Sequence, residues 1–118
     1  MDRDGGGYGG VEVRGEIVTV VLPGAYGKPR PALVVQSDLF EAHPSVSVLP
    51  ITSELRDTPL FRVRITPDAD NGLQNISEIM VDKATTIPRE KIGVLIGVAD
   101  YATMQEVNRC LAVFLGIA

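Results

Sequence analysis

Apolar residues change their spacing once along this chain, near residue 100, and this change constrains the fold more than any other feature of the sequence. Before it, they form short runs rich in Val and Ile that Pro and Gly interrupt, a pattern typical of buried strands joined by tight loops. After it, they recur at the three- and four-residue spacing of an amphipathic helix. The residues at this spacing are Tyr101, Met104, Val107, Leu111 and Phe114.

Two residues mark the ends of this predicted helix. Asp100 is the expected N-cap, and Gly116 is expected to end the helix in a left-handed conformation. Because the apolar stripe is wide, we expect the helix to be buried over much of its circumference, against a sheet or against a partner.

Five stretches upstream of residue 100 predict strands. They are residues 16–22, 31–37, 45–52, 60–66 and 77–87. The second is apolar on both faces and is expected to be central, whereas the fourth alternates apolar residues with two arginines. Pro50 marks the end of the third as an edge or a bulge. The fifth is expected to be a strand pair or one long bent strand, and short helical turns are predicted at Ser37–Ala42 and at Pro88.

Length and composition indicate one domain without disulfides. The chain has 118 residues, of which 1–13 form a predicted flexible Gly-rich tail and 14–118 a single domain. With one cysteine, no intrachain disulfide can form, which favours a reducing compartment. No apolar run approaches the roughly 20 residues of a membrane span, and the N-terminus lacks the apolar core of a signal peptide. We therefore expect a cytoplasmic protein with no membrane partner.

The charge of the chain and its few histidines and cysteines exclude several functions. A net charge of −4 argues against a protein that coats nucleic acid without specificity, although basic residues do bunch locally. The glycine run at the N-terminus precedes any strand, so it is no phosphate-binding loop. One His and one Cys do not supply the ligands of a typical zinc site. His43 lies in a turn and Cys110 on the apolar stripe, so neither is expected to be catalytic.

Arg30 has unusual neighbours. It stands between Pro29 and Pro31, directly before the apolar run that begins at Ala32. Each proline fixes its own φ near about −65° and pushes the preceding residue toward an extended backbone. A charge held in this way costs little to align during a reaction. Arg30 is therefore a candidate catalytic or phosphate-binding residue.

Five segments, taken in order, resemble the MazF/PemK family of bacterial toxins. They are "RGEIVTVVL", "KPRPALVVQSDLF", "VLPITS", "EIMVDKATTI" and "LAVFLG", and together they span Arg14 to Gly116. The resemblance implies a mainly β fold of the α+β class: an SH3-like, partly open β-barrel with a small extra sheet and a long C-terminal helix. It also implies a homodimer with an RNA groove at its interface, and a cognate antitoxin protein as partner.

The same resemblance implies a metal-independent, sequence-specific endoribonuclease that needs no cofactor and cuts single-stranded RNA. The 2′-OH would attack the adjacent phosphorus, leaving a 2′,3′-cyclic phosphate and a 5′-OH. Arg30 matches the family's "RP" arginine and would stabilise charge on the phosphoryl oxygens. Thr52 matches the hydroxyl residue that donates a hydrogen bond to such an oxygen. Asp82 is the third catalytic candidate; it is a base, a partner of Lys83 or simply the end of a strand.

Seven further residues are candidates for RNA contacts. They are Tyr26, Lys28, Ser53, Arg56, Arg62, Arg64 and Lys83. Tyr26 is expected to stack on a base, and the cations are expected to contact the backbone. The chain departs from the family at Met80, where an arginine is common, and at 83–86, where the family's "Q-x-R-T" is absent.

Two other functions stay open. CcdB-type gyrase poisons resemble this family in fold and cut nothing, and fold does not fix function. An inactive RNA- or antitoxin-binding member of the family is the second alternative, which the departures at Met80 and 83–86 favour. Ribonuclease chemistry needs Arg30 and Thr52, whereas gyrase binding does not.

Overall fold

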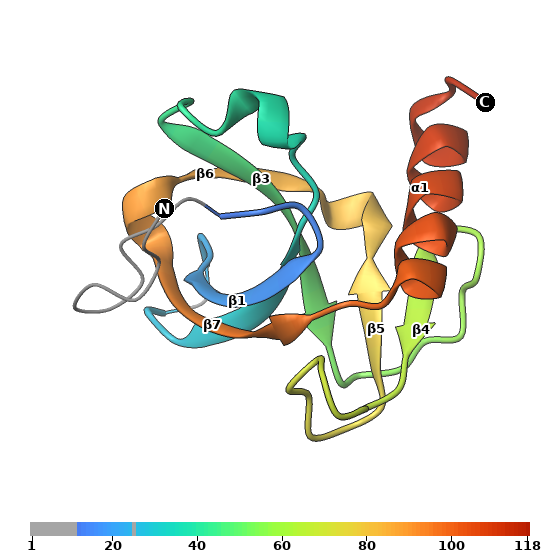
Figure 1. The fold of residues 1–118 in the computed structure, drawn as a ribbon. Helices are drawn as coiled ribbons and strands as arrows, with labels where there is room; N and C mark the ends of the chain where they lie inside the picture. Colours follow the sequence, from blue (N-terminus) through green and yellow to red (C-terminus); the bar gives the residue numbers. More distant parts are fainter. Residues whose placement is uncertain (1–11, 25) are drawn as a thin grey trace.

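The computed structural model describes residues 12–24 and 26–118, and in this part of the chain seven strands precede one α-helix (Figure 1). The strands are β1 (Glu16–Val21), β2 (Pro29–Val34), β3 (Ser45–Thr52), β4 (Arg62–Ile65), β5 (Ser77–Met80), β6 (Thr85–Pro88) and β7 (Ile92–Val98). The helix is α1 (Tyr101–Leu115). Three 3-10 turns are η1 (Asp38–Phe40), η2 (Val81–Lys83) and η3 (Arg89–Lys91).

All strand pairs are antiparallel, and β3 connects two parts of the sheet. The order β4-β5-β3-β2-β1-β7 runs across the sheet, while β6 pairs with the first half of β3. Strands β7, β1, β2, β3 and β6 curl around a common interior, and β4 and β5 extend β3 beside the helix (Figure 1). The predicted mainly β fold with a small extra sheet and a C-terminal helix is confirmed.

Pro50 lies where β3 changes partner. Residues Ser45–Val48 pair with β6, and Ile51 and Thr52 pair with β5. Pro50 falls between these two ladders, and on the other side it stands opposite Ala32 of β2. A residue without a backbone N–H is tolerated at such a gap in the ladder. The proline predicted to mark an edge or bulge thus marks the junction of the two parts of the sheet.

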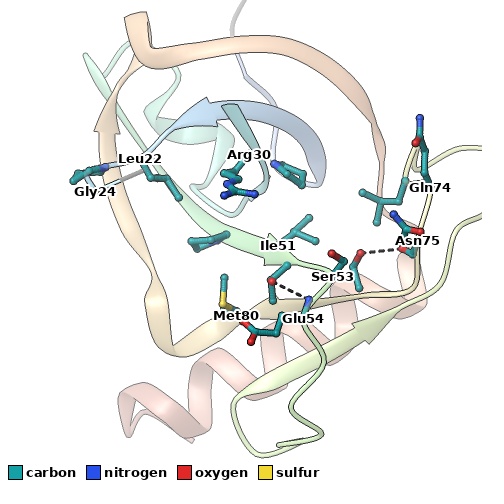
Figure 2. Close-up of a pocket in the computed structure, with 15 residues that line it drawn as sticks. Leu22, Gly24, Arg30, Ile51, Ser53, Glu54, Gln74, Asn75 and Met80 are labelled. Carbon is teal, nitrogen blue, oxygen red and sulfur yellow. Dashed lines mark hydrogen bonds between the residues drawn. The ribbon is translucent and has the colours of Figure 1, made fainter. Parts of the chain in front are cut away.

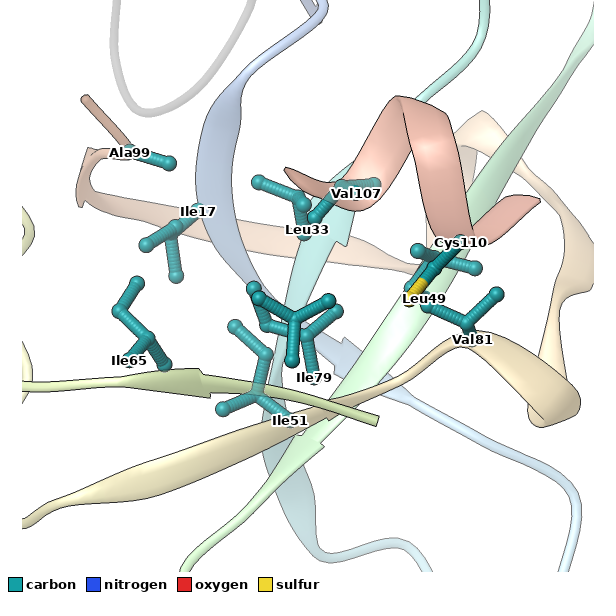
Figure 3. Packing of buried hydrophobic residues seen from close by; sticks show 11 residues of the cluster. Ile17, Leu33, Leu49, Ile51, Ile65, Ile79, Val81, Ala99, Val107 and Cys110 are labelled. Atoms are coloured by element: carbon teal, nitrogen blue, oxygen red, sulfur yellow. The ribbon is translucent and has the colours of Figure 1, made fainter. Parts of the chain in front are cut away.

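The strands β1, β2 and β3 contribute side chains to two separate cores. One core lies inside the curled strands and contains Val18, Val20, Ala32, Val34, Val46, Val48 and Ile87. The other lies between the small sheet, the barrel and α1, where Val107 and Cys110 pack over residues such as Leu33 and Leu49 (Figure 3). The prediction that the second strand is apolar on both faces is confirmed, because Leu33 faces one core and Val34 the other.

The helix α1 has the predicted ends and a narrower buried face than expected. Asp100 Oδ1 accepts a hydrogen bond from Thr103 N at 2.8 Å, and Gly116 is left-handed at φ 76°. The Thr103 side chain first, and its backbone N–H second, lower the pKa of Asp100. Within the chain, only Val107 and Cys110 of α1 are buried. Several apolar side chains of α1 and the C-terminus are at least half exposed: Tyr101, Val113, Phe114, Leu115 and Ile117. The sheet of the single chain therefore does not bury the helix over much of its circumference, and burial of the remaining apolar side chains against a partner stays a prediction.

Two segments differ from the predictions in detail. The stretch 77–87 is a strand pair, β5 and β6, separated by η2. The strand β7, which pairs with β1, was not predicted. Of the predicted tail, residues 1–11 lie outside the described residues, whereas Glu12 is buried and forms an ion pair with Arg89. Among the residues that the structure describes, no helix combines the length and the apolar character that crossing a membrane requires.

Candidate active site

A pocket of about 630 Å³ opens where the end of β3 meets the start of β2 and the segment before β5 (Figure 2). Its volume falls within the range of about 300–1,000 Å³ that is typical of ligand sites. The lining residues are Leu22, Pro23, Gly24, Arg30, Pro31, Pro50, Ile51, Thr52, Ser53, Glu54, Leu73, Gln74, Asn75, Ser77 and Met80. Three residues predicted from the sequence therefore share this pocket: Arg30, Thr52 and Ser53.

Arg30 reaches the pocket because its strand has a free edge there. Arg30 lies opposite Val20 in the ladder with β1, and the pairing of β2 with β3 begins only at Ala32. Pro29 and Pro31 thus occupy the part of β2 that has one neighbour, where a missing N–H breaks no ladder on the open side. The strand begins two residues earlier than predicted, so Arg30 stands on a strand instead of in the preceding loop.

Within the part of the chain that the structure describes, no residue compensates the charge of Arg30. Of the seven arginines in residues 12–24 and 26–118, it is the one whose guanidinium makes no hydrogen bond or ion pair with any described residue. The other six are Arg14, Arg56, Arg62, Arg64, Arg89 and Arg109. Figure 2 shows Arg30 directed into the pocket. An exposed, unpaired guanidinium is available to bind an anion such as a phosphate, for which its fork of donors is well suited.

The hydroxyl of Thr52 is fixed by a turn. The backbone N–H of Glu54 donates to Thr52 Oγ1 at 3.0 Å, the dashed line at the floor of the pocket in Figure 2. This bond uses a lone pair of the oxygen and leaves the O–H proton available to donate. Thr52 is half-buried, so its hydroxyl is held at the surface of the pocket. Arg30 and Thr52 together offer a fixed positive charge and a fixed hydrogen-bond donor.

Arg62 and Arg64 share one buried carboxylate. Arg62 Nη1 and Arg64 Nη2 each lie 3.1 Å from an oxygen of Glu78, which also accepts from the backbone N–H groups of Arg56 and Asp57. Burial alone would raise the pKa of Glu78, but these donors lower it to about 2. Two guanidiniums against one carboxylate leave a net positive charge. Arg64 presents it to solvent, with 46% of its side chain exposed against 10% for Arg62.

This cluster is on the same face of the small sheet as Thr52. Thr52 stands opposite Glu78, and Glu78 stands opposite Arg64 in the ladders of β3, β5 and β4. Directly opposed residues of antiparallel strands direct their side chains to one face. The positive charge of Arg64 therefore continues from the pocket across the small sheet.

The other predicted site residues lie outside the pocket. Asp82 belongs to η2, which packs against α1, and its buried Oδ1 has no hydrogen-bond partner among the described residues. Lys83 follows it and is exposed. Tyr26 is fully exposed at φ 54°, and Lys28 beside it is exposed as well. Arg56 is exposed, and its guanidinium lies 3.3 Å from the Glu54 carboxylate.

Four functional candidates were missed by reasoning from the sequence. Glu54 supplies the one carboxylate among the lining residues, and Gln74 and Asn75 supply two side-chain amides. Glu78 organises the arginines of β4. The "TS" after "VLPI" could have indicated Glu54, because Thr favours a turn to the residue two positions on. No local pattern indicates the other three.

The donors of this site suit an anion better than a metal ion. No group of three His, Cys, Asp or Glu side chains that could hold a metal occurs within residues 12–24 and 26–118. A phosphate next to Arg30 and Thr52 would meet a cation, a hydroxyl donor and apolar walls from Leu22, Pro31 and Ile51.

Comparison with known proteins agrees with this arrangement. Residues 13–115 match the family described as PemK-like, MazF-like toxin of type II toxin-antitoxin system. A protein of Mycolicibacterium smegmatis named probable endoribonuclease MazF is 46% identical over 106 residues, covering 89% of this chain and 97% of that protein.

Two solved structures share the fold. A mycobacterial endoribonuclease in complex with its cognate antitoxin is 25% identical, with a TM-score of 0.77 over 91% of this chain and 97% of that one. The Mycobacterium tuberculosis toxin MazF-mt6 is 25% identical, with a TM-score of 0.75 over 87% and 98%. Because the family match covers most of the chain and the first relative is nearly half identical, the chain belongs to the PemK-like, MazF-like toxins of type II toxin–antitoxin systems and is an endoribonuclease.

Proposed function

We propose that this toxin cuts single-stranded RNA at selected sequences, without a metal ion, by attack of the 2′-OH on the adjacent phosphorus. One observation carries the proposal: an unpaired guanidinium, Arg30, shares a pocket with the oriented hydroxyl of Thr52. RNA brings its own nucleophile, so the protein needs to align the phosphate, stabilise its charge and move two protons. The products are a 2′,3′-cyclic phosphate and a 5′-OH.

Arg30 and Thr52 act on the phosphoryl oxygens. As the 2′-oxygen approaches phosphorus, negative charge grows on the non-bridging oxygens. The Arg30 guanidinium, which has no competing partner among the described residues, binds one or both of them. The Thr52 O–H donates to the same group, since the bond from Glu54 N already fixes the direction of the hydroxyl. Neither group has to reorganise when the charge develops.

Two carboxylates compete for the role of proton acceptor. Asp82 is the candidate from the family resemblance, but it does not line the pocket. Glu54 does, on the same turn as Thr52. Its side chain is 72% exposed beside Arg56, so its carboxylate is accessible to a bound 2′-OH. We favour Glu54 for this step, and the substitutions that separate the two are given below.

The RNA strand extends from the pocket over the small sheet. Ser53 follows Thr52, and Arg64 lies on the other side of Glu78 from Thr52; both can contact the RNA backbone, as can the exposed Arg56. Tyr26 and Lys28, in the loop before β2, approach from the opposite side, where a fully exposed ring can stack on an unpaired base. Arg62 is committed to Glu78 and supports Arg64, and Lys83 offers a more distant charge.

Partners follow from the exposed surfaces and from the relatives. The exposed apolar side chains of β7 (Val94, Leu95) and α1 (Phe114) support a homodimer. A related mycobacterial endoribonuclease forms a complex with its cognate antitoxin. An acidic antitoxin segment lying across Arg30 and Arg64 would compete with RNA for the same charges. We place the toxin domain at residues 14–118 and its action in the cytoplasm, where RNA is available and the lone thiol stays reduced.

Cleavage in EDTA tests the proposal. A long unstructured RNA is incubated with wild type, with Arg30→Ala and with the control Arg109→Ala, which removes an exposed arginine of α1. We expect discrete cuts with 2′,3′-cyclic phosphate ends from wild type and from the control. Arg30→Ala should lose at least about 10²-fold in rate, as for removal of one oxyanion donor.

Other results identify the alternatives. RNA binding without cleavage by wild type would show an inactive RNA-binding member of the family. Inhibition of DNA gyrase supercoiling without RNA binding would show a gyrase poison. Full activity of Arg30→Ala would contradict the mechanism whichever products are found.

A further inference from the structure

The wall of the pocket away from Arg30 has a different chemistry. It is formed by Leu73, Gln74 and Asn75, from the segment between β4 and β5. In Figure 2, Gln74 and Asn75 stand on one side of the cavity and Gly24 and Leu22 on the other. Both amide side chains are exposed and make no hydrogen bond with any described residue. Two complete sets of amide donors and acceptors are therefore available to a ligand.

The backbone that carries these amides is firmly anchored. Asn71 is 1% exposed; its Nδ2 donates to Thr66 O at 2.9 Å, and its Oδ1 accepts from Leu73 N at 3.0 Å. The Val98 N–H of β7 donates to Asp70 O at 2.9 Å. Because the buried Asn71 side chain makes these hydrogen bonds, it holds the loop in a fixed conformation. Gln74 and Asn75 thus project from a support that is fixed relative to β7.

Glycines allow the close approach of this loop to β7. A Cβ on Gly72, which has φ +71°, would lie 2.3 Å from Ile96 O. A Cβ on Gly97 would lie 2.4 Å from Asn71 O. Both distances are below any real contact of a Cβ, so the packing of the loop on β7 depends on these two glycines. The position of the amides is therefore set by the sheet.

This wall does not suit a phosphate. Residues 66–76 contain no Lys or Arg and include Asp68 and Asp70. A side-chain amide, in contrast, presents a donor and an acceptor side by side, which matches the edge of a nucleobase. Leu73 and Met80 add apolar surface against which the face of a base can pack. In single-stranded RNA the base edges are free to be read in this way.

We infer that Leu73, Gln74 and Asn75 form a nucleobase subsite, in which the two amides read the base of a nucleotide next to the phosphate held by Arg30. The inference rests on the proposed function, since it names how that site selects its sequence. Arg30 and Thr52 at one end of the pocket then act on the phosphate, and Gln74 and Asn75 at the other end discriminate between bases.

Sequencing of cleavage sites tests the inference. A randomised single-stranded RNA pool is cut by wild type, Gln74→Glu, Gln74→Met, Asn75→Asp and Asn75→Leu, and both new ends are sequenced. The acidic variants replace a donor by an acceptor at constant shape, and the apolar variants remove both groups without adding charge. Gln105→Glu, on the exposed face of α1, is the matched control.

We expect a change of base preference at one position near the cut. The ratio of preferred to non-preferred base at that position should fall by about tenfold in a variant of Gln74 or Asn75, the typical effect of losing one paired contact to a base. The other recognised positions and the control should keep the wild-type preference. An unchanged preference in all four variants overturns the inference, even if the cleavage rate falls.

A binding experiment separates this inference from the proposed function. Anisotropy of labelled deoxy-oligonucleotides of a single base (A, C, T or G) is measured with the same proteins, because DNA lacks the 2′-OH and cannot be cut. If wild type cuts no RNA but prefers one base, and the variants lose that preference, the nuclease is refuted and the subsite stands. Equal affinity for all four bases in wild type, or a preference that all variants keep, overturns the subsite.

Discussion

Arg62 donates from Nη1 to Glu78 Oε1 at 3.1 Å, and both side chains are almost completely removed from water. Arg64 binds the second oxygen, and the N–H groups of Arg56 and Asp57 bind the same carboxylate. Through these hydrogen bonds, Glu78 of β5 connects β4 to the segment that follows β3. That turn carries Thr52 and Glu54, so the stability of the small sheet and the geometry of the pocket are linked.

Substitution of Glu78 should lower stability in a pH-dependent way. Its pKa falls from 4.5 to about 2 on folding, so its contribution is present above pH 4.5 and is lost as the pH drops toward 2. At pH 7 we expect Glu78→Gln to reduce the free energy of unfolding by about 3 kcal/mol. Urea denaturation of both proteins from pH 7 to pH 2 measures the difference, which should shrink below pH 4.5. A difference that stays constant with pH would contradict this account.

Arg30 should matter for cleavage and not for folding. Because its guanidinium binds no described residue, Arg30→Ala should change the free energy of unfolding by less than about 0.5 kcal/mol, as for other exposed positions. Arg30→Lys keeps the charge but loses the two-pronged donor geometry, so its single-turnover rate should fall between those of wild type and Arg30→Ala. Equal rates for Lys and Ala at this position would show that charge is not what Arg30 contributes.

Glu54 and Asp82 can be separated as proton acceptors. If Glu54 accepts the 2′-OH proton, Glu54→Gln should lower the single-turnover rate by about 10²-fold or more. Asp82→Asn should leave the rate within a few-fold of wild type, since Asp82 does not line the pocket. Single-turnover cleavage assays from pH 4 to pH 9 measure the rates of both variants. The reverse pattern would assign the role to Asp82.

Gly97 does not line the pocket, but Gly97→Ala should change the geometry of the pocket by displacing the loop that carries Gln74 and Asn75. The added methyl group would meet the Asn71 backbone at 2.4 Å, so the loop or β7 must shift. Such overpacking costs about 1–3 kcal/mol. The free energy of unfolding should fall by this amount, and the Michaelis constant should rise more than the maximal rate falls. Glu90→Ala, at an exposed position of η3 directly before β7, is the control and should change neither. A Gly97→Ala protein with wild-type stability and kinetics would show that this close contact is dispensable.

Local patterns were sufficient to predict most elements of the fold. The β-branched runs of β1 and β3 and the capped, periodic α1 depend on neighbours within a few residues, so a sequence reveals them. The strand β7 was missed because Gly93 and Gly97 interrupt its apolar run. Each of these glycines is required by contact with a distant residue, Thr19 and Asn71 respectively. Non-local contacts of this kind leave no periodic signal.

The site was predicted in part for the same reason. Arg30 is marked by its two prolines, and Thr52 by its place in the "VLPITS" segment that resembles the family. The pairing of Arg62 with Glu78 joins residues 16 apart on neighbouring strands, and strand register is needed to see it. Gln74 and Asn75 lie in a loop whose composition resembles that of any turn.

The two ends of the pocket come from different kinds of structure. Arg30 and Thr52 stand on strands whose other residues fill both cores, so few changes there are compatible with folding. Gln74 and Asn75 stand in a loop that is anchored to the rest of the fold through Asn71, Gly72 and Leu73. Side chains at 74 and 75 can therefore be exchanged without altering the scaffold. If these two side chains read a base, substitutions at 74 and 75 would change the target sequence while leaving the residues that cut it in place.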